Sequence, residues 1–398
     1  MARVVIIKSF IKRFRLPFYR HLRHRLADRG VELRVVFGQG DRFHAADTDI
    51  VSSLPLGVRT HNRYFYFDHT SLAWQPAWGH LRGANLVVVQ QGNRHLLNHL
   101  LLLSHRAMGF KLAFWGHAKN FQSSRASGLR ERIKRVYTTR VDYWFAYTRR
   151  SRAVLRQMGF PADRITTVQN AIDTSRLIGL YDSVTDEQVN ALRAELGMQD
   201  QDVAAVYCGR FYGLKDVDFM LRCADKIHAA NPRFHLILMG DGCEVWKVKR
   251  FCHSHDRWAH YVGARYGLDK VRYFRLATCQ IMPGAVGLGI VDSLALLTPL
   301  ITRQLDRHGP EIDYLRPDVN GMITPASAQA YTRGVLACIS SRSLQQHLVR
   351  GCVNTRSRYT IENMAGRFAE GVCRALAMKP YVRRQRRIRK PVLECSFT

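Results

Sequence analysis

The sequence predicts an α/β protein made of two doubly wound domains. Short apolar runs alternate with helical stretches along most of the chain, a pattern typical of parallel sheets with helices on both faces. At 398 residues and 46% hydrophobic composition, the chain is too long for one ordinary core and long enough for two. We expect domains over 1–175 and 201–358, a connection over 176–200, a helix over 359–378 and a basic tail over 379–398.

The first half alternates between strand-like and helical segments. The expected strands are 3–7, 31–37, 86–89, 111–115, 143–147 and 164–168, and the expected helices are 17–29, 96–108 and 151–158. The strand 111–115 ends in Gly116, which is followed at once by His117. Ligands bind at the carboxyl ends of parallel strands, so His117 is a candidate for chemistry. A buried structural histidine is the alternative.

The second half contains a strand followed by a cationic turn. The apolar run 203–208 is followed directly by Gly209, and Arg210 and Lys215 lie five residues apart around the turn. Two cations placed in this way can converge on a diphosphate at the strand's carboxyl end. Two later strands end at Gly240 and Gly263, and the gap between them is the predicted pocket for a nucleotide base.

A glycine-rich loop, 283–289, opens into an apolar helical segment that carries Asp292. Glycine lets the backbone approach a ligand closely, and the free amides at the start of a helix favour phosphate. We expect the amides of Val286, Gly287 and Leu288 to face the ligand. An acid at position 292 can then accept hydrogen bonds from sugar hydroxyls.

From about Ala204 to Gly321 these motifs together resemble the donor site of the family 4 glycosyltransferases, also called glycosyl transferases group 1. The resemblance implies the GT-B fold, in which two Rossmann-like domains face a central cleft and the carboxyl-terminal helix crosses back to the first domain. It also implies that a hexose moves from a nucleotide-diphosphate sugar to an acceptor with retention, and that no metal or cofactor is needed. One motif differs: the family usually carries two glutamates separated by seven residues, and this chain has Gly284 and Asp292 there.

The resemblance, together with the placement of the motifs, assigns roles to individual residues. The catalytic candidates are His117, Arg210 and Lys215. The donor-binding candidates are Gly209, Gly240, Gly263, Val286, Gly287, Leu288 and Asp292. The candidates on the acceptor side are Lys12, Arg13, Arg15, Lys119 and Asn120.

The net charge is strongly positive, since 61 Lys and Arg against 31 Asp and Glu give +30. Such a field attracts polyanions, and anionic lipid is the partner that we expect. Phe18, Leu22 and Leu26 repeat every four residues beside Arg20 and Arg23, which predicts a membrane-facing amphipathic helix. Further basic runs are 130–140, 149–150 and 383–390. No nucleic-acid-binding motif accompanies the charge, so we expect no nucleic-acid partner.

These features place the enzyme in the cytoplasm, attached peripherally to the inner face of the plasma membrane. The nine cysteines form no Cys-x-x-Cys pair, and the chain has no signal-peptide core. There we expect it to glycosylate a glycan or lipid-linked saccharide during synthesis of cell-surface polysaccharide, such as lipopolysaccharide or capsule.

Several other interpretations stay open. A nucleotide-sugar epimerase shares the GT-B architecture, and the absent first glutamate also allows a catalytically silent nucleotide-sugar binding protein. The acid-x-acid triplets 47–49 and 216–218 resemble metal sites of the GT-A fold, but neither directly follows a strand. Cys243, Cys252, His253 and His255 have spacings that fit no usual zinc pattern.

Overall fold

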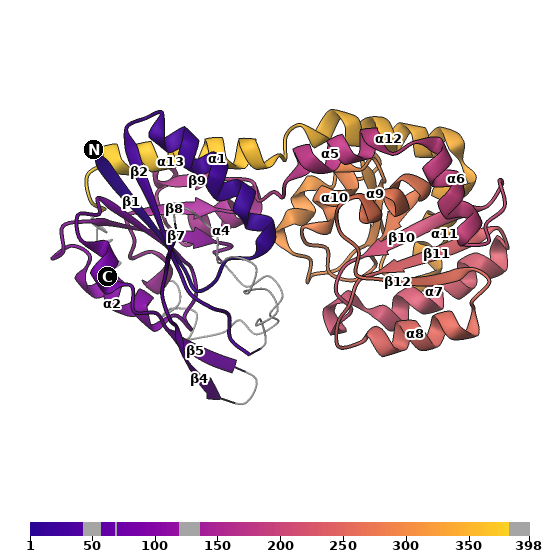
Figure 1. Cartoon of the computed structure of the whole chain (residues 1–398), viewed down its shortest axis with the longest axis horizontal. Coiled ribbons are helices and arrows are strands. Elements are labelled where there is room, and N and C mark those ends of the chain that lie inside the picture. Colours follow the sequence, from indigo (N-terminus) through magenta and orange to yellow (C-terminus); the bar gives the residue numbers. More distant parts are fainter. Residues whose placement is uncertain (43–56, 68–69, 119–135, 382–398) are drawn as a thin grey trace, which may run out of the picture.

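The computed structural model describes residues 1–42, 57–67, 70–118 and 136–381. Two α/β domains lie side by side along the long axis of the molecule (Figure 1). Each is built on a parallel sheet, which confirms the predicted fold class. Lys119, Asn120, the triplet 47–49 and the tail 383–390 lie outside the described residues.

The first domain is a parallel sheet in the order β3-β2-β1-β6-β7-β8-β9. Its strands are β1 (Ala2–Lys8), β2 (Val31–Phe37), β3 (Gly57–Arg59), β6 (Leu86–Gln90), β7 (Lys111–Gly116), β8 (Tyr143–Ala146) and β9 (Ile165–Thr167). Its α-helices are α1 (Leu16–Ala27), α2 (Leu96–Ser104) and α4 (Arg149–Gln157). A separate antiparallel hairpin, β4 (Arg63–Phe67) and β5 (Thr70–Trp74), projects from this domain (Figure 1). The strand order reverses between β1 and β6, so a crevice is expected there.

The second domain is a parallel sheet in the order β12-β11-β10-β13-β14-β15. Its strands are β10 (Val203–Cys208), β11 (Phe234–Met239), β12 (Ala259–Gly263), β13 (Cys279–Ile281), β14 (Leu300–Arg303) and β15 (Gly321–Thr324). Its helices are α5 (Thr174–Ser183), α6 (Asp186–Glu195), α7 (Val217–Ala230), α8 (Val245–Ser254), α9 (Gly267–Leu276), α10 (Gly289–Ala295), α11 (Ala328–Ser340) and α12 (Arg342–Arg356). Here the order reverses between β10 and β13.

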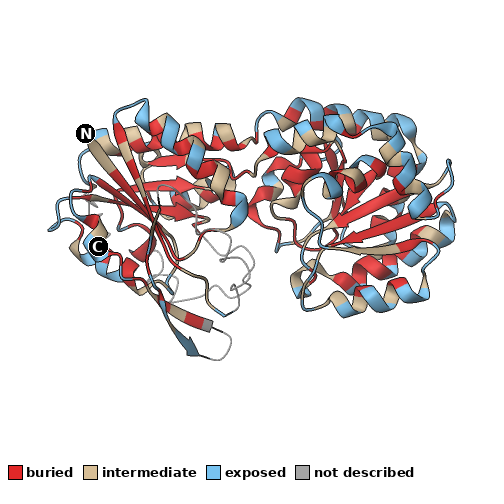
Figure 2. Cartoon of the chain, viewed as in Figure 1, coloured by how far each residue is buried: buried red, intermediate tan, exposed pale blue. Residues whose placement is uncertain are grey.

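Each domain has its own apolar core on both faces of its sheet. Buried residues follow the strands and the inward faces of the helices (Figure 2). Val184, Leu192 and Met198 belong to the core that also contains Ala204 and Val206. The segment expected as a connection, 176–200, therefore packs as part of the second domain.

The helix α13 (Ile361–Ala377) leaves the second domain and packs against the first, as predicted. Its Phe368 stacks on Phe145 with ring centroids 4.0 Å apart, and Trp115 meets the same ring edge-on at 5.0 Å. Aromatic burial of this kind contributes more than its area alone. The crossover helix is thus part of the first domain's core.

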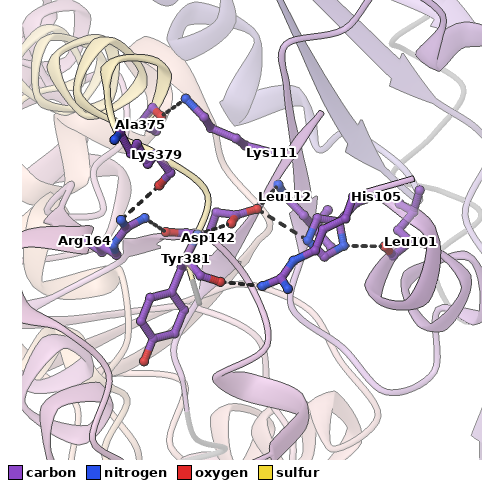
Figure 3. Close-up of polar contacts among 10 residues, drawn as sticks. Leu101, His105, Lys111, Leu112, Asp142, Arg164, Ala375, Lys379 and Tyr381 are labelled. Carbon is purple, nitrogen blue, oxygen red and sulfur yellow. Dashed lines mark hydrogen bonds and ion pairs between the residues drawn. The ribbon is translucent and has the colours of Figure 1, made fainter. Parts of the chain in front are cut away.

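The last turn of α13 and the residues after it form hydrogen bonds with the amino ends of the first domain's strands (Figure 3). Lys111 Nζ donates to the carbonyls of Ala375 and Leu376 at 3.1 and 2.5 Å, where a cation suits the unpaired carbonyls of a helix end. Asp142 accepts from the amide of Tyr381 at 2.7 Å and from that of Leu112 at 2.9 Å. The chain is therefore anchored at the sheet edge opposite the carboxyl ends of the strands.

The prediction of a membrane-facing α1 is wrong. Phe18, Leu22 and Leu26 are fully buried in the first domain's core, together with residues of α13. The apolar stripe of an amphipathic helix looks the same in sequence whether it faces a bilayer or a protein core. Among the described residues, no helix has both the length and the apolarity needed to cross a membrane.

Candidate active site

The two donor motifs meet at the switch point of the second sheet. The turn after β10 carries Gly209, Arg210 and the short 3₁₀ helix η5 (Gly213–Lys215), and the glycine loop 283–289 follows β13. β10 and β13 are neighbouring strands that run parallel. Motifs far apart in the sequence therefore share one crevice at the carboxyl ends of the strands, where ligands bind in open α/β sheets.

Hydrogen bonds to several neighbouring residues fix the first part of the glycine loop 283–289. The Ala285 amide donates to Leu214 O at 2.8 Å, and Lys215 Nζ donates to the carbonyl of Ala285. Arg303 Nε donates to the carbonyl of Pro283 at 3.1 Å. A loop held in this way needs little rearrangement to bind a ligand, which is how preorganised sites gain strength.

His308 holds the next residue of the loop. Its Nδ1 accepts from the Val286 amide at 3.1 Å, and its Nε2 donates to the carbonyl of Arg303 at 2.8 Å. These bonds require the neutral tautomer with the proton on Nε2, and burial lowers the pKa of His308. The amide of Gly309 returns a bond to Val286 O at 2.7 Å. Val286 therefore cannot offer its amide to a donor as predicted.

The free amides begin one residue later than the sequence suggested. In the described part of the chain, the amides of Gly287, Leu288 and Gly289 donate no hydrogen bond, and all three residues are partly exposed. Consecutive free amides form a concave site for anions. The arrangement leaves Gly287 and Leu288 of the predicted set available to a phosphate.

The two cations of the turn differ in environment. Arg210 is exposed, and its side chain has no polar partner among the described residues. Lys215 lies under the loop, where burial lowers its pKa to about 8 and the carboxylate of Glu311 opposes this shift. Its ammonium is therefore close to titration near neutral pH.

Gly284 has no space for any side chain. A Cβ added there would lie 2.2 Å from the carbonyl oxygen of Lys215 and 2.5 Å from its Cα. No side chain can therefore be accommodated at position 284 while the loop keeps its contact with the turn.

Asp292, the second altered position, forms a buried ion pair. Its Oδ1 lies 2.5 Å from Lys270 Nζ of α9, and the residue is 9% exposed. Cys208, at the end of β10, is close enough for both charges to act on its thiol, whose pKa burial raises to about 11. The acid thus lies beside the end of β10, at the predicted sugar side of the donor site.

Gly209, Gly240 and Gly263 are joined by their backbones. The Gly209 amide donates to Met239 O at 3.0 Å, and the Gly240 amide to Gly263 O at 2.9 Å. A Cβ at Gly240 would lie 1.8 Å from Gly209 O, and the residue has φ 146°. Close approach of two backbones explains this glycine without a ligand.

His117 lies directly after β7, at the carboxyl edge of the first sheet. Its ring is 4.4 Å from that of Tyr147, and its Nδ1 is buried without a hydrogen-bond partner. Burial lowers its pKa, Glu311 of the second domain raises it, and Arg15 and Lys8 lower it further. Ala118 next to it has φ 64°, a conformation that residues with a Cβ rarely adopt. The histidine is therefore neutral and faces the second domain.

The sequence analysis did not predict the series of hydrogen bonds that joins the two domains. Asn170 Nδ2 donates to Glu311 Oε1 at 2.7 Å, and Asn170 Oδ1 accepts from Arg15. Arg15 also donates to the carbonyl of Ala171 at 3.0 Å. Its guanidinium is therefore committed to the segment that joins the domains, which corrects its assignment to the acceptor side. In the sequence, the segments 308–311 and 170–173 each resemble family 4 sequence, but nothing there indicates that Glu311 and Asn170 are bonded to each other.

Arg13 lies in the same short 3₁₀ helix as Arg15, η1 (Arg13–Arg15), and is exposed. Lys12, directly before it, has its Nζ 6.0 Å from the centre of the Phe10 ring. In the acid-x-acid triplet 216–218, Asp216 forms an ion pair with Arg303, whereas Asp218 forms one with Lys247 at 2.6 Å. The two acids are therefore paired with two different basic side chains. Among the described residues, no three His, Cys, Asp or Glu are grouped to hold a metal ion.

Two family models match this chain, one over each domain. The model of Glycosyltransferase Family 4 matches residues 18–176, and that of Glycosyl transferases group 1 matches residues 202–341. The chain carries both domains of a GT-B glycosyltransferase. No curated protein matches it by sequence.

Solved structures share the fold of this glycosyltransferase over nearly the whole chain. Anabaena Alr3699/HepE in complex with UDP is 15% identical, with a TM-score of 0.70 over 94% of this chain and 100% of that one. A glycosyltransferase from Rickettsia africae is 10% identical, with a TM-score of 0.71 and coverages of 95% and 99%. The lipopolysaccharide outer core galactosyltransferase WaaB is 13% identical, with a TM-score of 0.65 and coverages of 93% and 99%.

The space around the loop glycines gives a matched pair of variants for this glycosyltransferase. Gly284→Ala should lower the free energy of unfolding by about 1–3 kcal/mol, because the methyl group meets the backbone of Lys215. Gly287→Ala meets no atom within 4 Å and should leave the melting temperature close to that of the wild type. Thermal denaturation compares the two, and equal melting temperatures would show that the loop and the turn are not in rigid contact.

Proposed function

We propose that the protein transfers a hexose with retention from a nucleoside diphosphate sugar to a saccharide acceptor, without a metal or cofactor. The observation that carries the proposal is the switch-point crevice, where a fixed loop presents the free amides of Gly287 and Leu288 beside Arg210 and Lys215. Cations and amides together can neutralise a departing diphosphate.

The proposed chemistry requires little from the protein beyond charge. The bond between the anomeric carbon and the phosphate oxygen breaks, and the acceptor oxygen forms a bond to the same face of that carbon. Arg210, Lys215 and the loop amides stabilise the leaving diphosphate, which takes the acceptor's proton. His117 is neutral, so it can hydrogen-bond to the sugar without adding a positive charge next to the cationic transition state.

We propose the classes of donor and acceptor from similar proteins and from the residues at the first domain's switch point. Alr3699/HepE is solved with UDP and with UDP-glucose, and we propose a uridine donor for this chain as well. Two other similar structures are the lipopolysaccharide outer core galactosyltransferase WaaB and WaaG, a glycosyltransferase involved in lipopolysaccharide biosynthesis. We propose a glycan or lipid-linked saccharide of cell-surface polysaccharide as acceptor. Its hydroxyls would meet the polar side chains of Ser9, Gln75, Gln90, His95 and Asn98, which lie together at the first domain's switch point.

The function is tested by transfer from UDP-sugars to a panel of saccharide acceptors, with the anomeric configuration read by NMR. We expect a product that keeps the donor's configuration, and no loss of rate with a chelator. Arg210→Ala and Lys215→Ala should each lower kcat/KM about a hundredfold, because a site that loses one charge-stabilising group loses about that much. Wild-type rates in both folded variants would remove them from the site. UDP released without acceptor would indicate an epimerase, and binding without turnover a silent protein.

Lys215 gives this site a predicted pH dependence. Its pKa of about 8 belongs to the ligand-free protein, and the cationic form is the one that binds a diphosphate. Affinity for UDP should therefore be constant near pH 7 and weaken as the pH rises through about 8. Calorimetric titration between pH 7 and 9.5 measures the affinity for UDP as a function of pH. Lys215→Arg should make this affinity independent of pH, because guanidinium stays charged. A flat wild-type profile would contradict the assignment.

We further propose that the enzyme is cytoplasmic and binds the anionic inner face of the plasma membrane through the β4–β5 hairpin. Phe65 and Phe67 are 49% and 58% exposed on one face of this ribbon. The opposite face is used by the domain itself, since Tyr64 Oη donates to the carbonyl of Gln39 at 2.6 Å. One apolar face therefore has no partner among the described residues, which is unusual for a two-stranded ribbon.

Helix α2 extends this apolar surface. Leu100 and Leu103 are 43% and 76% exposed, and β5 is joined to the start of α2 because the Ala73 amide donates to the carbonyl of Arg94 at 2.8 Å. Arg63 and Arg94 are exposed beside it. Apolar side chains flanked by bases fit an anionic bilayer, which attracts each nearby base by about 1 kcal/mol.

Vesicle sedimentation tests this surface. The wild type should bind vesicles that contain anionic lipid, and the double variant Phe65→Ser/Phe67→Ser should bind at least fivefold more weakly. Trp246→Ser is the matched control, because Trp246 is 53% exposed on the second domain. Binding should also fall as salt rises, since screening shortens the field to about 8 Å at physiological ionic strength. Unchanged binding by the double variant would rule the hairpin out as the membrane contact.

A further inference from the structure

The ion pair between Lys270 and Asp292 lies at the place where the family motif differs. Asp292 projects from α10 and Lys270 from α9, and their charged atoms are 2.5 Å apart. Both side chains are only 13% exposed. Within the described chain, Lys270 is the only side chain that bonds to the carboxylate, and it bonds to Oδ1. Oδ2 therefore remains free for a ligand.

Lys270 stays charged in this environment. Burial lowers its pKa, but the attraction of Asp292 and the hydrogen bond to it outweigh burial and raise the pKa above its usual value. The thiol of Cys208 is neutral because burial raises its pKa to about 11. The local charges are thus one ammonium and one carboxylate, and each fixes the position of the other.

A carboxylate binds both hydroxyls of a ribose best when each of its two oxygens accepts a hydrogen bond from one hydroxyl. Here the ammonium occupies Oδ1 with a short, charge-assisted bond, and its hydrogens repel a hydroxyl hydrogen approaching the same oxygen. The glutamate that the family motif places eight positions earlier is Gly284, which has no room for a side chain. A side chain at position 284 therefore cannot supply the second contact.

We propose that Lys270 is a positioning residue that locks the Asp292 carboxylate, so that the single oxygen Oδ2 reads a single hydroxyl of the donor ribose. This inference rests on the proposed function, because it needs a nucleotide in the second domain. It predicts that the 2′- and 3′-hydroxyls contribute unequally to binding, and that the contribution depends on Lys270.

The first experiment uses the unmodified protein and three ligands: UDP, 2′-deoxy-UDP and 3′-deoxy-UDP. Calorimetry should show that one deoxy analogue binds about tenfold or more weakly than UDP, the loss expected for one hydrogen bond to a charged group. The other analogue should stay within about threefold of UDP. Equal losses for both analogues, or no loss for either, would overturn the proposal while leaving the proposed function standing. Absence of any UDP binding would overturn both.

The second experiment separates positioning from mere packing. Lys270→Met removes the ammonium from Oδ1, so both oxygens of the Asp292 carboxylate can accept a hydrogen bond from the ribose. In that variant, the affinities for 2′-deoxy-UDP and 3′-deoxy-UDP should become similar, whereas in the wild type they should differ by about threefold or more. Comparing the two analogues cancels the contacts of the diphosphate, which both share.

Lys270→Arg serves as the matched control because it keeps the charge beside Asp292. It should retain at least part of the wild-type difference between the two analogues, whereas Asp292→Asn should bind UDP and the sensitive analogue about equally well. A Lys270→Met variant that keeps the wild-type ratio would show that Lys270 does not act on Asp292.

Discussion

The donor half of the molecule depends on one close contact between two backbones. The turn after β10 and the loop after β13 touch at Gly284, where an added Cβ would lie 2.2 Å from Lys215 O. Ala285 is bonded to this turn through both its amide and its carbonyl. Because the two strands flank the point where strand order reverses, the contact places the cations of one motif beside the amides of the other. The same contact leaves no space for a side chain at position 284.

A short segment after β14 connects this loop to the other domain. His308 and Gly309 bond to Val286 of the loop, and Glu311 of the 3₁₀ helix η6 (Pro310–Tyr314) accepts from Asn170. Glu311 is only 4% exposed, and burial makes an unpaired carboxylate costly. The angle between the domains and the shape of the donor loop are thus tied to one set of buried hydrogen bonds.

Strong local patterns in the sequence predicted the fold well. The strands 31–37 and 203–208 have the predicted bounds, because long apolar runs between turn residues leave little choice of structure. The short strands β3, β13 and β15 were missed, since three or four residues carry too little pattern and form strands only beside a neighbour. The apolar stripe of α1 was assigned to a membrane for a related reason: periodicity shows that a face is apolar, and not what covers it.

The sequence by itself determined the two α/β domains and the existence of the last helix, because each is written in neighbouring residues and follows from local propensity and periodicity. That this helix crosses back to the first domain was implied only by the family resemblance. Only the tertiary structure decided which polar groups are free. Val286 loses its amide to His308, Arg15 is bound at the junction of the domains, and Asp292 is paired with Lys270 from another helix. These partners lie 22 to 156 positions apart. Their pairing depends on how the sheets and helices pack, which no local pattern records.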